Sequence, residues 1–454
     1  MKKKVLSLVM TAVLATSMLA GCGSSGNAGA TSAGNTSDKT ETKTETKTET
    51  TTATDTASAG EVDITFPCIW VGEDSKAAVF GKMVEGFNTE NAGKYHVTIQ
   101  DQVDYDAYQD QLRTQISTGA APDIFTVKTQ ADVQYYASSG KCMDLTAFLA
   151  GDISGNFMTG AIENAKKDGV NYAMPYEMAY IPVMYNQTLF DGAGAAVPTS
   201  FEDLWTACET LKSGGDTPMC QMTANNAWTS MLWYSYALAA CGGADVYSKD
   251  YTDQAYVDAA NLVKKMYDYT NSDAVGADAS VVNGHFFTGD DAVYTNGTWI
   301  LGRINSDEAT YAGPNGETLY DSLTLGGGLS NGGKNGNAFI SYCQAYIMCG
   351  ATDDANKQAG IEAFLTYITD KDRVLELANS SGSLFAISID ASKLSNVKAA
   401  EAFAIAQKAS FIIPSFESQA ATEVANAFPS LLESLVLGDI SAEEFAQGLA
   451  DKAK

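Results

Sequence analysis

Basic residues are scarce in this sequence. Lys and Arg together number 28 and Asp and Glu number 55 among 454 residues, which gives a formal net charge of −27 at pH 7. A protein that binds nucleic acid needs a basic patch to neutralise phosphates. The charge balance therefore argues against a nucleic-acid partner.

Histidine is almost absent, and cysteine never forms a Cys-x-x-Cys pair. His96 and His285 are the two histidines, and neither supports a Ser-His-Asp arrangement. Zinc sites are built mainly from closely spaced Cys and His. The stretch Gly328–Lys334 has the spacing of a phosphate-binding loop, but Asn335 stands where Ser or Thr is required. We expect neither a metal nor a cofactor.

Eight cysteines are present, and the seven after Cys22 are widely scattered. An odd, scattered set does not form a disulfide framework, so we expect most of them to be small buried apolar residues. Two bridges, Cys220–Cys241 and Cys343–Cys349, remain open as alternatives.

Long apolar runs are missing except near the N-terminus. Lys2-Lys3-Lys4 precedes an apolar stretch over 6–20, which has the length of a signal peptide and is too short to span a bilayer comfortably. It ends in Leu19-Ala20-Gly21-Cys22, which resembles a bacterial lipobox. The resemblance implies a signal peptide over 1–21 and a lipid on Cys22. The protein would then be held at the extracytoplasmic face of the cell membrane, most simply on a Gram-positive surface.

The segment 22–60 consists mainly of Ser, Gly, Thr and Ala, with a Thr-Glu-Thr-Lys repeat. It has no aliphatic residue larger than alanine and cannot build a core, so we expect a disordered linker. The remainder has ordinary globular composition and is long enough for two domains.

The first third of the folded part alternates strands and helices. We expect strands over 62–70 and 95–101, helices over 76–88 and 104–118, and a strand opening at 121–125. This alternation predicts an α/β fold with a largely parallel sheet. Helices are also expected over 201–211, 228–240, 251–269, 355–368, 372–378, 419–437 and 441–450.

The stretch Asp168–Phe190 organises the chain. Asp168-Gly169 is a turn dipeptide, and Pro175 and Pro182 exclude a helix interior between them. Two extended pieces joined through Tyr176, Glu177 and Tyr180 indicate a crossing from one layered unit into another. A polar group flanked by aromatics at such a crossing suits a ligand, although a buried strand pair with tyrosines at its edge is the simpler alternative.

A series of segments in order resembles the extracellular solute-binding proteins of bacterial ABC importers, in particular the family 1 carbohydrate-binding lipoproteins that include maltodextrin-binding proteins. The matching segments are the lipobox, the strand to Trp70, Phe87-Asn88, Ser117–Phe125, Gly169–Pro175 with Tyr185-Asn186 and Leu189-Phe190, Pro198–Asp203, Asn296–Trp299 and Ile361–Leu365. At Gly382-Ser383-Leu384-Phe385 the chain lacks the proline that often follows the glycine in this family.

The resemblance implies a two-lobed, periplasmic-binding-protein-like fold of type II, with a ligand cleft between lobes joined by hinge crossings. Lobe one would comprise 61–178 plus 343–385, and lobe two 183–338 plus 388–454. The protein would be a monomer that binds a sugar and delivers it to a membrane permease, with no chemistry on the ligand.

Sugar binding needs flat apolar surfaces for pyranose CH faces, and carboxylates or amides for hydroxyls. Trp299 is the best stacking candidate because it follows a polar turn, and Asp123 is a candidate that could instead cap the local backbone. Open α/β sheets place ligands at the carboxyl ends of their strands, which favours Lys128, Glu73 and Asp74. The candidate ligand-binding residues are Trp70, Glu73, Asp74, Asp123, Lys128, Tyr176, Glu177, Tyr180, Trp228, Trp233 and Trp299.

Other functions stay open at this stage. An exported glycan hydrolase would need a carboxylate pair at glycosidase spacing, whereas the acidic pair Asp290-Asp291 is expected by chance among 55 acidic residues. An adhesion module would show a flat apolar patch in place of a cleft. The same receptor fold could take a peptide, amino sugar or polyol. Few basic residues near the expected cleft disfavour a phosphorylated or strongly anionic ligand.

Overall fold

The computed structural model describes residues 60–102, 104–158 and 161–454. The elements described below all belong to one compact unit, which covers 55–454. The expected signal peptide, the lipidation site at Cys22 and the linker up to residue 59 lie outside the described residues. Among the residues that are described, no helix is long and apolar enough to cross a membrane.

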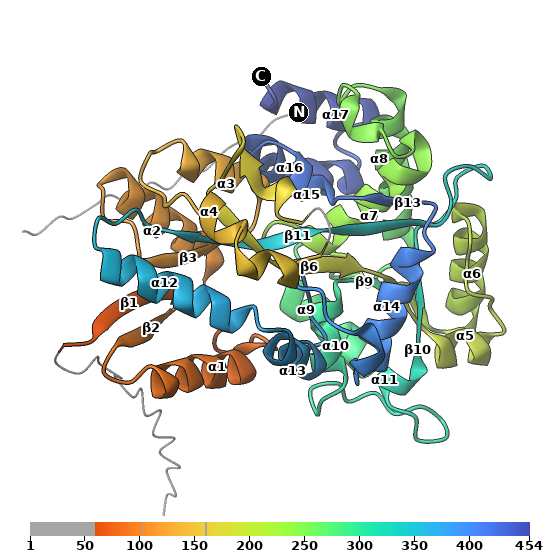
Figure 1. The fold of residues 1–454 in the computed structure, drawn as a ribbon. Helices are drawn as coiled ribbons and strands as arrows, with labels where there is room; N and C mark the ends of the chain where they lie inside the picture. The colour runs from red at the N-terminus through yellow and green to blue at the C-terminus, as the bar shows by residue number, and fades with distance from the viewer. Residues whose placement is uncertain (1–59, 103, 159–160) are drawn as a thin grey trace, which may run out of the picture. The chain divides into compact units, whose positions relative to one another are not determined.

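The N-terminal elements follow the predicted alternation (Figure 1). Strands β1 (Val62–Cys68) and β2 (Tyr95–Asp101) pair in parallel, and helix α1 (Ala77–Glu90) connects them. Helix α2 (Tyr105–Ser117) leads to β3 (Ile124–Val127). Phe80, Met83, Val84 and Phe87 form the buried face of α1, as its periodicity predicts.

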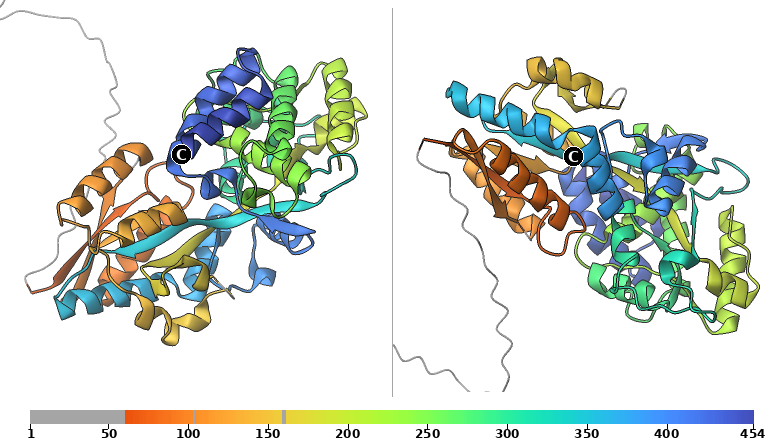
Figure 2. Two further views of the ribbon diagram at one scale, coloured as in Figure 1. Left: turned by 90° about the horizontal axis from the view of Figure 1, so that it is seen from above. Right: turned by 60° about the horizontal axis from the view of Figure 1, so that its bottom comes forward.

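A five-stranded sheet contains β12 (Leu384–Phe385), β6 (Ala173–Ile181), β11 (Ala338–Cys349) and β13 (Phe411–Ile413) in that order, with β3 also paired to β11. The twelve-residue β11 pairs with β13 near its start and with β3 near its end. Figure 2 shows this cyan strand running from the orange elements to the green and blue ones.

A second sheet has four strands in the order β10 (Leu323–Gly326), β7 (Val183–Asn186), β9 (Asp291–Thr295) and β8 (Thr217–Met219). Beside it lies α7 (Trp228–Gly242), which is buried along most of its length and packs on α8 (Gln254–Met266). The two sheets are the frames of a two-lobed α/β fold, as predicted.

The chain passes from the first sheet to the second at Pro182, between β6 and β7. Tyr176, Glu177 and Tyr180 lie inside β6 and not at the junction. The strand continues past them because β11 and β12 pair with this part of β6. The junction at Pro182 lies between the expected lobe segments 61–178 and 183–338, and it follows Tyr176, Glu177 and Tyr180 along the chain.

Helices cover both sheets. Their bounds are α3 Gln130–Ala137, α4 Thr146–Leu149, α5 Gln187–Ala193, α6 Phe201–Gly214, α9 Ala279–Thr288, α10 Leu301–Ile304, α11 Leu319–Ser322, α12 Ala355–Ile368, α13 Lys371–Ser381, α14 Val397–Gln407, α15 Phe416–Gln419, α16 Thr422–Leu437 and α17 Ala442–Lys452. Two short strands, β4 Lys166–Lys167 and β5 Val170–Asn171, form a separate hairpin, and short 3-10 turns complete the set. Helices α3, α5, α9 and α14 and the four-residue helices α4, α10 and α11 were not predicted.

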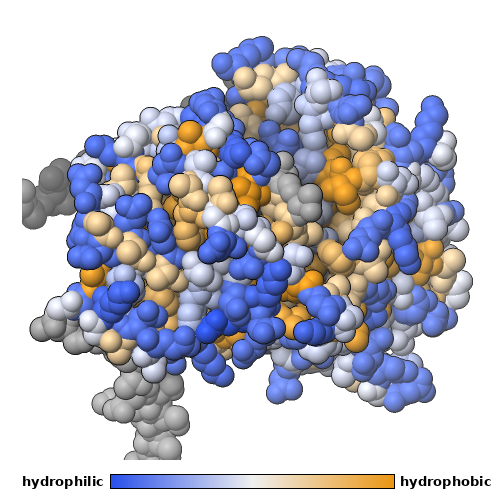
Figure 3. Space-filling model, in the orientation of Figure 1, coloured by the Kyte–Doolittle hydropathy of each residue, from blue (hydrophilic) through white to orange (hydrophobic). Residues whose placement is uncertain are grey.

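Hydrophobic clusters fill the space between helices and sheets. One gathers Phe66, Phe80 and Phe364 around β1, α1 and α12, and another gathers Trp233 and Phe428 around α7 and α16. Hydrophilic residues cover much of the face in Figure 3, with apolar residues scattered among them.

Every cysteine in the described part of the chain is a free thiol. Five are buried, while Cys241 and Cys343 are half-buried. Neither of the two bridges considered from the sequence is formed.

Candidate functional site

A cavity of about 750 Å³ lies within the compact unit, between elements of the two sheets. From the N-terminal side it is lined by Ile69–Asp74, Lys76, Gln102, Tyr105, Lys128 and Thr129. Strands β6 and β11 contribute Glu177, Tyr342, Gln344 and Ala345. The remaining residues, near α7, α10 and α15, are Asn226, Trp228, Leu232, Trp299, Arg303, Glu417 and Ser418. Its size is that of a pocket for a small organic ligand.

Strands β1, β2 and β3 explain the N-terminal side of the cavity: β1 and β2 form a two-stranded parallel sheet, and β3 belongs to the five-stranded sheet. Residues 69–76 follow β1, Gln102 follows β2, and Lys128 and Thr129 follow β3. The carboxyl ends of strands in an open α/β sheet form a crevice that suits a ligand. The structure places Glu73, Asp74 and Lys128 after strand ends beside one cavity.

A buried ion pair forms one end of the cavity. Lys76 Nζ lies 3.0 Å from Glu177 Oε1 and 3.1 Å from Asp74 Oδ1. The indole Nε1 of Trp70 donates to Glu177 Oε2 at 3.0 Å. Lys76 and Glu177 are each 3% exposed, so the pair is almost fully removed from solvent.

Lys76 keeps its charge in this setting. Burial by itself would lower the pKa of a lysine, but the carboxylates of Glu177 and Asp74 outweigh it and raise the pKa of Lys76 above its usual value. The ammonium therefore stays charged beside Glu177 and Asp74 at neutral pH.

Aromatic residues form the opposite wall. Trp228 begins α7, Trp299 follows β9, and both are half-buried with ring centroids 6.1 Å apart and planes inclined by 45°. The Trp299 ring lies across Gly297, where an added Cβ would meet ring atoms at 2.0–2.2 Å. Gly297 thus permits the ring position, and the two indoles present apolar surface beside Leu232.

An irregularity in β11 contributes two further lining residues. The pairing of β11 with β6 shifts register between Cys343 and Ala345, where Gln344 has no partner in the register. Bulges redirect side chains near functional sites. Tyr342 and Gln344 on this stretch both line the cavity.

Seven of the eleven predicted residues line the cavity: Trp70, Glu73, Asp74, Lys128, Glu177, Trp228 and Trp299. They come from the segments after β1 and β3, from β6, from α7 and from the turn after β9, and only the fold brings them together. Their contact with a ligand stays a prediction.

Asp123 and Trp233 lie elsewhere. Asp123 accepts hydrogen bonds from the backbone N and Oγ1 of Thr65 at 2.9 Å and pairs with Lys357 at 2.9 Å, so it ties β1 to the start of β3 and to α12. Trp233 is fully buried within α7, where it packs near Tyr236. Each serves the surrounding structure.

Tyr176 and Tyr180 face hydrophobic clusters and not the cavity. The Tyr176 hydroxyl donates to the Ile368 carbonyl at 2.9 Å, and its ring packs against Trp70 and Phe385. Tyr180 packs against Phe339 and Phe403. Side chains alternate along β6, so the strand that points Glu177 into the cavity turns Tyr176 and Tyr180 away.

Sequence reasoning missed several lining residues, including Lys76, Tyr342, Gln344, Arg303 and Glu417. Lys76 lay in an expected helix start, and the bulge that places Gln344 has no sequence signature. Glu417 opens a short helix near the C-terminus that reaches the cavity only through the packing of α15 against α7.

The expectation of few basic residues near the cleft was wrong. Lys76, Lys128 and Arg303 all line it. The sequence does not show that these three residues lie together, because they belong to segments far apart in the chain. Each of them contacts other groups of the protein, which limits its ability to bind an anionic ligand.

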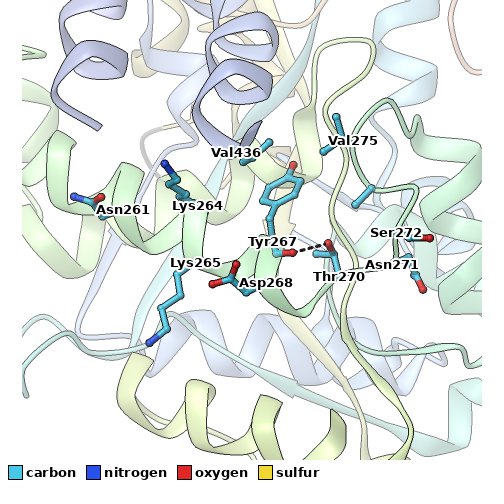
Figure 4. Close-up of a pocket in the computed structure, with 11 residues that line it drawn as sticks. Asn261, Lys264, Lys265, Tyr267, Asp268, Thr270, Asn271, Ser272, Val275 and Val436 are labelled. Atoms are coloured by element: carbon cyan, nitrogen blue, oxygen red, sulfur yellow. Dashed lines mark hydrogen bonds between the residues drawn. The ribbon is translucent and has the colours of Figure 1, made fainter. Parts of the chain in front are cut away.

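A second, smaller pocket of about 440 Å³ lies on the surface formed by α8 and the loop after it (Figure 4). Lys264, Lys265 and Asp268 point outward around it, while Thr270 donates a hydrogen bond to the Tyr267 carbonyl at 3.2 Å. It is lined by residues of 261–275 and by Val436 and contains none of the predicted residues, so the larger cavity is the candidate site.

Comparisons with known proteins agree with this geometry. A sequence profile of the family described as "Bacterial extracellular solute-binding protein" matches residues 82–405, more than half of the chain. No curated protein matches the sequence significantly.

Solved structures share the fold at low sequence identity. A chitin oligosaccharide binding protein matches with a TM-score of 0.77 and 19% identity, over 87% of this chain and 99% of that one. A protein from work on xylan utilization by Caldanaerobius polysaccharolyticus matches with a TM-score of 0.76 and 21% identity, over 87% and 100%. The bacterial solute receptor AcbH, described as exclusively preferring β-D-galactopyranose, matches with a TM-score of 0.73 and 16% identity, over 87% and 98%. Because the family profile covers 82–405, which includes all four strands of the second sheet and most of the five-stranded sheet, the chain belongs to the bacterial extracellular solute-binding proteins.

Proposed function

We propose that the chain is the substrate-binding component of an ABC importer and binds a sugar or oligosaccharide in the cavity between its lobes. One observation carries the proposal. The indole rings of Trp228 and Trp299 line the same cavity as the carboxylates of Glu73, Asp74 and Glu177. Indole faces match the CH faces of pyranose rings, and carboxylates accept hydrogen bonds from sugar hydroxyls. The sugar-binding structural neighbours support the same ligand class.

The lobes we propose are 61–178 plus 343–385 and 183–338 plus 388–454. They would close on the ligand by hinge motion at crossings such as Pro182 and carry out no chemistry on it. Outside the cytoplasm, where its family works, the protein would be a monomer held by the lipid on Cys22, most simply on a Gram-positive surface, and would deliver the sugar to membrane permease subunits.

Thermal unfolding with a panel of mono- and oligosaccharides tests the ligand class. A sugar at a hundred times its dissociation constant should add about 2.7 kcal/mol to the free energy of unfolding, which shifts the midpoint visibly. The sugar should be recovered unchanged. Product formation would favour a glycan hydrolase, and a shift with peptides or polyols alone would replace the sugar with those ligands.

The tryptophan wall gives a sharper test. Trp299→Ala should weaken binding of the active sugar at least tenfold, about 1.4 kcal/mol, because the stacking surface is removed. Trp205→Ala is the matched control, since Trp205 is also half-buried but stacks on Tyr269 away from the cavity. Equal effects of the two substitutions would contradict the placement of the site.

A further inference from the structure

The three cations that line the cavity are engaged with the protein. Arg303 Nε donates a hydrogen bond to Glu308 Oε2, and Arg303 Nη2 lies 2.7 Å from the same oxygen. The Lys128 ammonium lies 3.6 Å from the centre of the Tyr105 ring. Lys76 contacts Glu177, Asp74 and Ser383 Oγ, the last at 3.4 Å. An anionic ligand would have to compete with these partners.

Lys76 is the most constrained of the three. An ammonium has three N–H donors, and three protein oxygens surround that of Lys76. Its side chain is 4% exposed, which leaves it little room to turn toward a ligand. Its position suits holding carboxylates better than receiving an anion.

The carboxylates keep acceptor capacity. Glu177 Oε2 accepts the Trp70 indole N–H, and Oε1 lies 3.0 Å from the Lys76 ammonium, so each oxygen has one protein contact and keeps a second lone pair for a ligand. Asp74 is partly open to the cavity, with 30% of its side chain exposed, and Glu73 lines the same rim. This end of the cavity therefore offers acceptors and lacks uncommitted cations.

We propose that Lys76 is a positioning residue that holds Glu177 and Asp74 as acceptors for ligand O–H or N–H groups, so that the cavity takes neutral or amino-bearing sugars and rejects sugars that carry a carboxylate. The inference rests on the proposed function and adds the charge class of the ligand. A sugar carboxylate placed here would lose its hydration beside two fixed carboxylates, and such unpaired, like-charge contacts discriminate between related ligands.

Calorimetric titration of the full-length protein tests the charge class. The neutral probes are cellotriose, xylotriose and N,N′,N″-triacetylchitotriose, and each is compared with the analogue in which glucuronic acid replaces the sugar at the non-reducing end. The glucosamine trimer is the amino-bearing probe. We expect the uronate form of the best neutral ligand to bind at least tenfold more weakly, and the amino form to bind at least as well as its N-acetyl counterpart.

Glu177→Gln tests the role of the ion pair. The change is nearly isosteric and retains an acceptor for Trp70, but it removes one negative charge and leaves Lys76 partly uncompensated. We expect neutral sugars to bind about tenfold more weakly and the ratio of neutral to uronate affinity to fall severalfold. A merely structural role would lower both affinities alike and leave the ratio unchanged.

The matched control is Glu90→Gln. Glu90 is an ion-paired carboxylate of the same lobe, 3.3 Å from Arg373, outside the cavity. Thermal unfolding of each variant checks that it folds. Lys76→Arg should retain more affinity for neutral sugars than Lys76→Met, because arginine keeps the positive charge.

Two results would overturn the inference by itself: equal binding of a neutral sugar and its uronate form, or an unchanged ratio in Glu177→Gln. Failure of every sugar to bind would instead overturn the proposed function, and this inference with it.

Discussion

At the scale of single residues, burial raises the pKa of one carboxyl group, that of Asp291. Asp291 is fully buried at the start of β9. It accepts hydrogen bonds from Cys220 Sγ at 2.8 Å and from Asn271 Nδ2 at 2.7 and 2.9 Å. Burial is the largest influence and raises the pKa of Asp291 to about 6, while these hydrogen bonds and nearby His285 oppose it and Asp290 adds to it. This carboxyl is poorly matched to its site when ionised.

This predicts a pH dependence of stability. The folded pKa lies above the ordinary 3.8, so the protonated form favours the folded state. The contribution is fully present below about pH 4 and is lost as pH rises through about 6. Between pH 4.5 and 7 it amounts to about 2 kcal/mol of unfolding free energy.

Asp291→Asn removes that titration. Denaturant unfolding of wild type and variant at pH 4.5 and 7 should show the variant gaining about 2 kcal/mol relative to wild type between the two pH values. Asp250→Asn serves as a control on an exposed carboxylate. A constant difference between variant and wild type across this range would contradict the role of Asp291.

At the scale of elements, capping residues set where a helix begins, and side-chain size sets how closely a helix packs on a strand. The helix expected over 201–211 begins at Phe201, where Ser200 caps α6 by accepting a hydrogen bond from the Asp203 backbone N–H. Asp203 in turn accepts from the backbone N and Oγ1 of Thr199. The sequence signal located the helix start because capping depends on neighbouring residues alone.

Packing of α12 on β1 depends on one glycine. A Cβ on Gly360 would meet Tyr95 Cδ1 at 2.8 Å and Ile64 Cδ1 at 2.9 Å. Gly360→Ala should lower the free energy of unfolding by about 1–3 kcal/mol through overpacking. Gly81→Ala in α1, where a Cβ has nothing within 4 Å, should raise it by up to about 1 kcal/mol through helix propensity.

Denaturant unfolding of both variants measures the two effects. Each change adds one methyl group to a helix. If Gly360→Ala lowers the free energy of unfolding while Gly81→Ala raises it, the difference comes from packing and not from helix propensity. A neutral or stabilising Gly360→Ala would show that α12 shifts from β1 at little cost.

At the scale of the whole molecule, two sheets share a cavity that neither builds alone. Strand β11 pairs with β13 and β3 at its two ends, and the chain changes sheets at Pro182. A ligand in the cavity would contact both lobes, so its binding energy can be coupled to their relative position.

The expected lipid anchor also concerns the whole molecule. In a Gram-positive host, the full chain should incorporate an alkyne fatty-acid label, and Cys22→Ala should abolish the labelling because the acceptor thiol is removed. Cys241→Ala, at a half-buried cysteine of the folded unit, should label like wild type. Labelling of the Cys22→Ala protein would contradict the lipobox interpretation.

The sequence by itself determined the local elements and the family. Helix α12 and strand β2 have the predicted limits, because hydrophobic periodicity is a property of neighbouring residues. It also brought out Trp299 through the polar turn before it, and Glu73, Asp74 and Lys128 through their places after strands. Only the tertiary structure decided which aromatics face the cavity. It turned Tyr176 and Trp233 into the core, paired Asp123 with Lys357, and set Lys76 between Glu177 and Asp74. The physical reason is that these roles depend on contacts between residues far apart in the chain, together with a bulge in β11 that no local pattern specifies.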